Sequence, residues 1–241
     1  MSIGERLRTL RRTLRTGQAG ISLPELLVAM ALAAVVMTLV VTFFATVSRT
    51  LSRDAAASSN TETASLGMRE LTRVLRSGTE IMVKDNPNLP VFLAASAREV
   101  TLHSFLDTDA ALPKPLRVNF RVTATGELVE TRWAAVPVNL TFWEFSPAVE
   151  SQRVIIRGVA GTVPVLRYFN AAGTELVPAT TSTPPGGVPV TGLSTAQLRE
   201  VVAVEIRLSV QTDPTGRADA VEMLNTVGIP NLGVSRVGAT T

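Results

Sequence analysis

Glu25 is a lone carboxylate at the start of a long apolar run, and its spacing from Ile21 could support an ion pair. The 22 residues from Leu26 to Val47 carry no charge. A lone carboxylate among apolar neighbours in a membrane is costly unless it is paired or functional. If the chain is cut after Gly20, Ile21 gains a free amine, and Glu25 follows four residues later, about 6 Å along the same helix face. The amine and the carboxylate could then neutralise each other, within one subunit or between staggered subunits.

Residues that could carry catalysis or bind a metal ion do not converge in the sequence. The chain has no cysteine and one histidine, His103, in a strand-like segment where packing or exposure is the usual role. The segment DTDAA, from Asp107 to Ala111, begins like a calcium loop but lacks the oxygen at its fifth position and the glycine at its sixth. No GxSxG, HExxH or phosphate-binding glycine loop occurs. We therefore expect no enzyme activity, no cofactor and no metal ion.

The apolar run is long enough to cross a membrane. As a helix, Leu26 to Val47 would measure roughly 33 Å, the thickness of a bilayer core. A cleavable secretory signal has a shorter apolar region that ends in small residues, whereas here Gly17, Ala19 and Gly20 precede the run. Arginines on the N-terminal side predict that this end stays in the cytoplasm, so that everything after Arg49 begins outside.

Positive charge is concentrated at the N-terminus. The first 20 residues hold five arginines and one glutamate, a net charge of +4, while the whole chain has +3, which leaves −1 for the rest. The remainder therefore lacks a bulk positive field that would attract a polyanion, and we predict no direct binding of nucleic acid.

Beyond the apolar run, residues 49–78 are predicted to continue the same helix as an amphipathic segment. The apolar residues on one flank are Leu66, Leu71, Val74 and Leu75. The charged residues that face elsewhere are Arg69, Glu70, Arg73 and Arg76. We expect these arginines to form a solvated face and not a ligand site. Arg76 followed by Ser77 and Gly78 predicts the end of the helix. The stretch Asp54 to Ser65 is small and polar and could fray or melt.

After residue 78 the pattern changes to short β-branched segments separated by turns. The predicted strand segments are EVTLHSFL (99–106), LRVNFRV (116–122), ELVETRWA (127–134), RVIIRGV (153–159), VPVLRYF (163–169) and EVVAVEIRLSV (200–210). TATGEL and NAAGTEL predict hairpin connections, and TTSTPPGGVP predicts an irregular loop. A last hairpin is expected from Arg199–Val210, a turn at TDPTG, and Ala218–Val227. The fold class is therefore α+β, a long N-terminal helix packed on an antiparallel β-sheet domain.

Six aromatic residues are predicted to belong to the core of this domain. They are Trp133, Phe142, Trp143, Phe145, Tyr168 and Phe169. An exposed subset could instead form an adhesive or subunit contact.

The segment GISLPELLVAMAL, Gly20 to Leu32, resembles the class III signal peptide of type IV pilins and type II secretion pseudopilins. Ile21 stands where phenylalanine is commoner, and Pro24 is tolerated in a first helical turn. The resemblance implies that a prepilin peptidase cleaves after Gly20 and methylates the amine of Ile21. It also implies that Glu25 guides recruitment into a helical filament.

Three further segments resemble the larger minor subunits, the W-type minor pilins and J-type pseudopilins. They are LTRVLRSG, VIIRGVAGTVPVLRYFNAAGTEL and LREVVAVEIRLSV. The resemblance implies four regions: a leader (1–20), a transmembrane and filament-core helix (21–48), its amphipathic continuation (49–78) and a strand-rich extracytoplasmic domain (79–241). It also implies other pilins or pseudopilins, the inner-membrane assembly platform and the inner membrane as partners. A membrane-anchored domain acting alone, as an adhesin, sensor or hydrolase, is the alternative.

Overall fold

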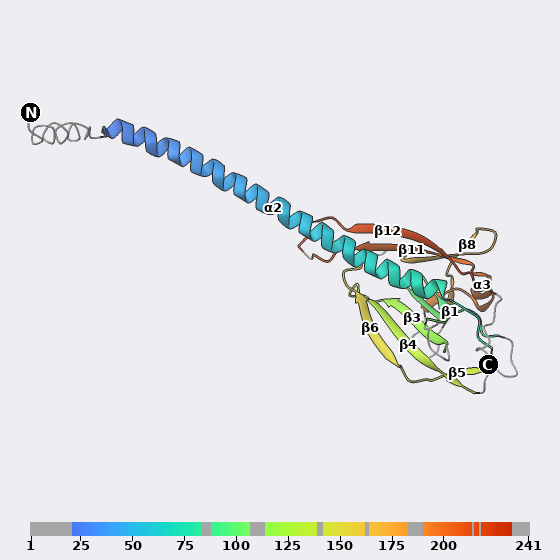
Figure 1. Cartoon of the computed structure of the whole chain (residues 1–241). Helices are drawn as coiled ribbons and strands as arrows, with labels where there is room; N and C mark the ends of the chain where they lie inside the picture. Colours follow the sequence, from blue (N-terminus) through green and yellow to red (C-terminus); the bar gives the residue numbers. More distant parts are fainter. Residues whose placement is uncertain are drawn as a thin grey trace, which may run out of the picture. The chain divides into compact units, whose positions relative to one another are not determined.

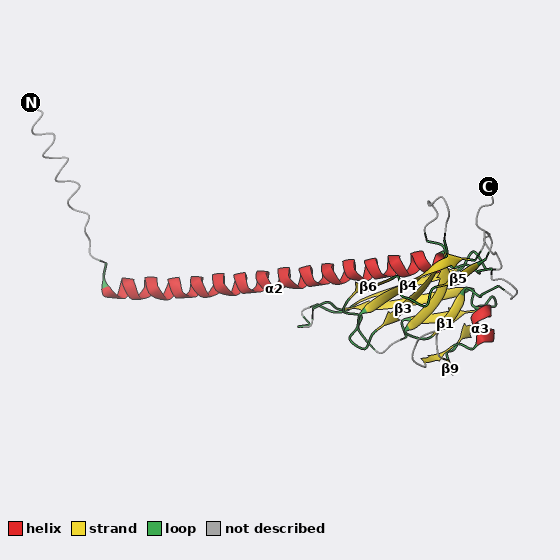
Figure 2. Ribbon diagram, turned by 90° about the horizontal axis from the view of Figure 1, so that it is seen from below, coloured by secondary structure: helices red, strands yellow, loops and turns green. Residues whose placement is uncertain are grey.

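The chain is described by a computed structural model that separates into two compact units, Met1–Ser52 and Arg53–Thr241. The described residues are 21–82, 88–106, 114–138, 142–161, 164–182, 190–213, 215–216 and 218–232. The predicted leader, residues 1–20, lies outside them. Helix α2, Leu23–Arg76, contributes to both units (Figures 1 and 2).

In the first unit, α2 is an apolar helix with no buried residue in its described part. Pro24 occupies its first turn, where the missing N–H breaks no helical hydrogen bond. Its most apolar window has a mean hydropathy of 2.7 with no residue buried, so α2 is long and apolar enough to cross a membrane. Hydroxyl groups bond within the helix: Thr38 Oγ1 donates to Ala34 O at 2.8 Å, and Thr42 Oγ1 donates to Thr38 O at 2.8 Å. These bonds satisfy the hydroxyl donors of Thr38 and Thr42 in an apolar surrounding.

In the second unit, α2 contributes one face to the core of the β-sheet domain. Its buried residues are Asn60, Ala64, Gly67, Leu71, Val74 and Leu75. The helix ends at Arg76, as predicted. The prediction that Leu66 lies on the buried flank is wrong, because its side chain is 48% exposed and Gly67 takes the position against the sheets. The stretch Asp54 to Ser65 is helical throughout and holds two of the buried positions.

The described residues form one sheet of six antiparallel strands on one side of this part of α2 (Figure 1). Its strands are β1 (Phe92–Ala95), β2 (Glu99–Ser104), β3 (Leu116–Val122), β4 (Leu128–Pro137), β5 (Trp143–Phe145) and β6 (Ser151–Ile156). The order is β1-β2-β3-β4, and β5 and β6 both pair with the far side of β4. The TATGEL hairpin joins β3 to β4 as predicted, with Gly126 at a φ of 75° that favours glycine.

A second antiparallel sheet, ordered β12-β11-β7-β8 in the described residues, packs on the same helix. Its strands are β7 (Leu166–Phe169), β8 (Glu175–Leu176), β11 (Ala203–Val210) and β12 (Val221–Gly228). Side chains of β11 alternate between buried and half-buried, which places one face of the strand against the core. The last hairpin is confirmed, and so is the NAAGTEL hairpin between β7 and β8.

Several local elements differ from the prediction, which placed no strand at β1 or β5. A short helix, α3 (Thr195–Glu200), precedes β11, so the strand begins at Ala203 and not at residue 200. The Ser194 hydroxyl and the Gln197 side chain form a capping box at its start. The expected irregular loop also carries a small ladder of β9 (Thr180–Ser182) with β10 (Val190–Gly192), and residues 183–189 lie outside the described part.

The core of the second unit lies where α2 meets both sheets. A Cβ added to Gly67 would stand 2.6 Å from Ile156 Cδ1 of β6 and 3.0 Å from Leu208 Cδ2 of β11. The absence of a side chain therefore lets the helix backbone sit between the two sheets. Tyr168 of β7 is fully buried in the same cluster, and its hydroxyl donates to Ser96 O at 2.9 Å.

Candidate functional site

The predicted processing site lies at the start of α2. Gly20 lies outside the described residues, whereas Ile21 and Glu25 are within them, and both are exposed. Ile21 precedes the helix, and Glu25 is an acidic residue in its first turn, where the helix dipole favours a negative charge. Among the described residues no cation pairs with Glu25. Its carboxylate is therefore available to a group from outside the described chain.

The surface next to Glu25 is apolar on all sides. Exposed apolar side chains of this helix include Leu26, Leu27, Val28, Met30, Leu32, Val35, Val36, Met37 and Leu39. Each is more than half exposed, far more than a water-soluble surface helix would carry on every face. A helix that is apolar all round fits a membrane or a bundle of similar helices.

Five charged residues tie the C-terminal half of α2 to the first sheet. Glu130 of β4 has a fully buried side chain and accepts from Arg132 at 2.8 Å and from Arg153 of β6 at 2.5 Å. Glu70 of α2 pairs with Arg73 at 2.7 Å and with Arg153 at 2.5 Å. The hydrogen bond from Arg73 lowers the pKa of Glu70, against the opposing effect of partial burial. These contacts satisfy the buried carboxylate and are a structural tie, since each guanidinium already has a carboxylate partner.

His103 is a packed residue, one of the two roles, packing or exposure, that the sequence left open. Its ring is 1% exposed and stacks on Phe145 at 4.7 Å between centroids. Nδ1 lies 2.9 Å from Pro90 O, and a carbonyl oxygen only accepts, so Nδ1 carries the proton of the neutral ring. Burial, opposed by this hydrogen bond and assisted by the charge of Arg117, lowers the pKa of His103 to about 4. Among the described residues no three His, Asp or Glu side chains could hold a metal ion, and Asp107 to Ala111 lies outside them.

Asn60 fixes the turn of the last hairpin to α2, a role that the sequence did not reveal. Its Oδ1 accepts from the amide and the hydroxyl of Thr212, both at 2.8 Å, and its Nδ2 donates to Asp219 O at 3.1 Å. Asn60 is 0% exposed, so its polar atoms depend on these partners. The alanines and serines around Asn60 were a signal in the sequence for this contact, because small residues let another chain segment approach the helix.

The predicted aromatic core is confirmed for two of its six residues. Trp143 and Tyr168 are buried, whereas Trp133, Phe142, Phe145 and Phe169 are half-buried. The guanidinium of Arg117 lies over Trp133, 4.6 Å from the ring centroid. The fully buried aromatics Phe92 and Phe120 were not among the predicted six. Phe120 lies in a predicted strand, whereas Phe92 lies in β1, which the sequence pattern did not predict.

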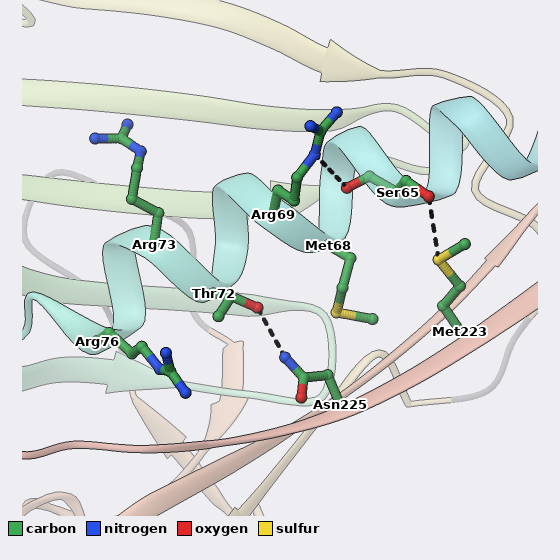
Figure 3. Close-up of a pocket in the computed structure, with 8 residues that line it drawn as sticks. All are labelled: Ser65, Met68, Arg69, Thr72, Arg73, Arg76, Met223 and Asn225. Carbon is green, nitrogen blue, oxygen red and sulfur yellow. Dashed lines mark hydrogen bonds between the residues drawn. The ribbon is translucent and has the colours of Figure 1, made fainter.

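A groove of about 500 Å³ lies between α2 and β12 (Figure 3). It is lined by Ser65, Met68, Arg69, Thr72, Arg73, Arg76, Met223 and Asn225. Asn225 Nδ2 donates to Thr72 Oγ1 at 3.0 Å, and Ser65 Oγ lies 3.8 Å from Met223 Sδ, as the dashed lines in Figure 3 show. The arginines are exposed along the helix, in agreement with the predicted solvated face.

Residues 15–41 match the family model described as the prokaryotic N-terminal methylation motif. The match covers the predicted cut between Gly20 and Ile21, Glu25, and the first part of α2. The chain has no match among the curated proteins. A motif of this kind implies processing by a prepilin peptidase and assembly with other pilins in a membrane, and the exposed apolar helix fits such anchoring. The motif therefore supports a precursor that begins like a type IV pilin or pseudopilin.

Proposed function

We propose that the protein is a minor pilin or pseudopilin, a structural subunit of a type IV pilus or a type II secretion pseudopilus. In this proposal it is made as a prepilin, cleaved after Gly20, N-methylated at Ile21 and assembled through α2. The observation that carries the proposal is the helix Leu23–Arg76, whose first half exposes apolar side chains all round and whose second half forms part of a folded core. A plain membrane anchor requires only the first of these features.

The proposed role of Glu25 follows from its position at the start of this apolar surface. A free carboxylate in an apolar bundle is stabilised by a nearby cation, and the amine created at Ile21 is the group of matching charge. We assign Glu25 to subunit recruitment and Ile21 to methylation. Beyond Gly78 the described residues form a six-stranded sheet, a four-stranded sheet and the small β9–β10 ladder. This is more than the lean globular part that a major subunit needs, which favours a minor subunit.

The proposed location follows from charge. The arginine-rich N-terminus stays in the cytoplasm, α2 crosses the inner membrane once, and the β-sheet domain lies outside before it joins the filament. Prepilin peptidase, other pilins or pseudopilins and the assembly platform are the partners in this proposal. It includes no catalytic residue, cofactor or metal ion, and the assembly machinery sets the task that the filament performs.

Processing is the decisive test. We expect Gly20→Val to block cleavage, because a peptidase must approach the backbone where the new Cβ would intrude. The precursor should then accumulate in the membrane about 20 residues too long, while Gly17→Val, a control in the same leader, should be processed. The intact mass of the wild-type protein should correspond to a methylated chain that begins at Ile21. An intact Met1, a cut elsewhere, or normal processing of Gly20→Val would favour an anchored domain that acts alone.

Abundance tests the minor role separately. Quantitative mass spectrometry of sheared filaments should find this chain far below a smaller companion pilin, because a minor subunit occupies few positions. If it is the dominant filament protein, the minor assignment is wrong, although the pilin assignment would stand.

A further inference from the structure

Among the described residues, β12 is an edge strand whose outer side pairs with no other strand. It pairs with β11 in a complete register from Ala203↔Gly228 to Val210↔Val221, and no other described strand pairs with it. An exposed strand edge presents a row of unpaired N–H and C=O groups to any extended chain. With eight residues, β12 offers the longest such edge in the described part of the chain.

The outward backbone groups of β12 can be assigned from the alternation of an antiparallel ladder. Ile229 N donates to Val202 O at 2.9 Å, and Arg207 N donates to Val165 O on the opposite side of β11. The amide of Ile229 faces β11, and amides two residues apart on a strand face the same side, so the amides of Met223 and Asn225 also face β11. Those of Glu222, Leu224 and Thr226 face outward, and no hydrogen bond to them is present within the described residues.

The α2–β12 groove lies beside this free edge. Met223 and Asn225 point from β12 toward α2, so a strand added beyond β12 would place alternate side chains against the same flank of the helix (Figure 3). The floor of the groove carries Met68 and Met223, which adapt to different apolar neighbours. An incoming strand would therefore find both backbone partners and a surface for its side chains.

The positive charge of the groove favours an acidic occupant. Arg73 pairs with Glu70, but Arg69 and Arg76 have no carboxylate partner among the described residues, and no acidic side chain lines the groove. Arg69 and Arg76 are seven positions apart, about 10 Å along the helix, which is the length of three strand residues. Acidic side chains spaced along an extended segment could reach both.

We propose that β12 and the flank with Arg69 and Arg76 receive an extended, acidic segment of a different subunit, which adds to the sheet as a strand. The inference rests on the proposed function, because a filament subunit has such neighbours. A second copy of this chain is the poorer occupant. Of its described edge strands of four residues or more, β1 and β6 carry no acidic residue, and β6 carries Arg153. β12 itself carries one acidic residue, Glu222, and one carboxylate does not match both arginines. Backbone pairing gives affinity in this binding mode, and the charges select the partner.

Site-specific photo-crosslinking in intact membranes tests where the partner lies. A photoreactive residue at Leu224, whose side chain is 58% exposed on β12, is compared with one at Val177, 60% exposed beside the opposite edge of the same sheet. We expect a cross-link from position 224 alone, and its peptide should be an acidic, strand-forming segment of another subunit with a methylated N-terminus. Cross-linking to a second copy, to a segment without acidic residues, or equally from both positions would overturn the proposal.

Two sets of variants test backbone pairing and charge. Leu224→Pro removes an outward N–H and leaves every bond to β11 possible, and Leu224→Ala is its control. Arg69→Glu combined with Arg76→Glu reverses the charge, and Arg199→Glu, on the exposed side of α3, is the matched control. We expect the proline and the double reversal to lower recovery of the partner roughly tenfold, while both controls retain it. The arginine variant changes only exposed side chains. It therefore still tests the proposed docking surface if Leu224→Pro disturbs folding.

The same preparations separate this inference from the proposed function. Mass spectrometry of the N-terminus reports methylated Ile21, and the sheared fraction reports assembly. If the protein is processed and assembled, and recovery of the partner is the same in the edge and charge variants as in the wild type, the strand-addition proposal alone is overturned. Unprocessed protein that never enters the filament would overturn both.

Discussion

His103 makes the stability of the β-sheet domain depend on pH in a narrow range. Its buried, neutral ring donates from Nδ1 to Pro90 O, and burial lowers its pKa from the ordinary value of 6.5 to about 4. The unfolded chain therefore binds more protons than the folded chain between these two values. Stability is fully present above pH 6.5 and falls as the pH decreases toward 4.

The size of the effect follows from the shift. Each pKa unit corresponds to about 1.4 kcal/mol, so a change from 6.5 to about 4 amounts to about 3 kcal/mol of unfolding free energy across the whole window. The slope should be about 1 kcal/mol for each pH unit. The pKa of Glu70 and that of Glu175 are also lowered, each chiefly by a hydrogen bond from an arginine, but their contributions are lost below about pH 4.5. Between about pH 5 and 6.5, the change in unfolding free energy with pH therefore reports His103.

The measurement is urea unfolding of the full chain in mild detergent, followed by tryptophan fluorescence at several pH values. Trp143 is buried in a small cluster with Ile81, Phe105 and Ala135, so its emission reports the domain. His103→Asn removes the only histidine but keeps a donor for Pro90 O, and we expect it to be less stable at pH 7 with a flat profile between pH 5 and 6.5. A flat wild-type profile, or a slope that survives in His103→Asn, would refute the reasoning.

Two further predictions concern α2. Glu25→Ala and Glu25→Gln should still insert, be cleaved and fold, but should fail to co-purify with partner pilins at equal membrane levels. The reason is that an amine would stay unpaired in an apolar bundle, at a cost of several kcal/mol. Normal assembly of both variants would exclude the recruitment role. Gly67→Val should lower the unfolding free energy by about 1 to 3 kcal/mol in the same urea assay, since its side chain would enter the space of Ile156 and Leu208. Gly228→Val, where an added Cβ meets nothing within 4 Å, is the control.

Features that depend on neighbours along the chain were predictable from the sequence. The end of α2 at Arg76 was indicated by Ser77 and Gly78, and the hairpin at Gly126 was indicated by its turn residues. β3 has the predicted bounds, 116–122, because a turn or irregular segment stands at both ends. The start of β11 was placed three residues too early, because the capping box at Ser194 competes with strand propensity and begins a helix.

Leu71, Val74 and Leu75 are buried on the flank that the sequence predicted. The other residues that join α2 to the sheets could not be predicted, because burial there depends on two partners at once. A helix that faces one layer shows a single apolar stripe, but this helix meets β6 and β11 around Gly67. The contact region therefore contains a glycine and the buried Asn60, while Leu66 remains exposed. Likewise, the pairing of Glu130 with Arg153 brings together residues of separate strands, which no local pattern encodes.

The sequence by itself determined the features that depend on composition and local spacing: the membrane-length helix, the carboxylate four residues after Ile21, the turns and the α+β class. These arise from hydrophobicity and short-range sterics, which act between residues close in the chain. Only the tertiary structure decided that Asn60 and Gly67 belong to the buried face of α2 and that His103 is enclosed. It also decided that, among the described residues, β12 ends a sheet beside two arginines that have no carboxylate partner. Those properties depend on strand order, and strand order is set by how distant segments share one core.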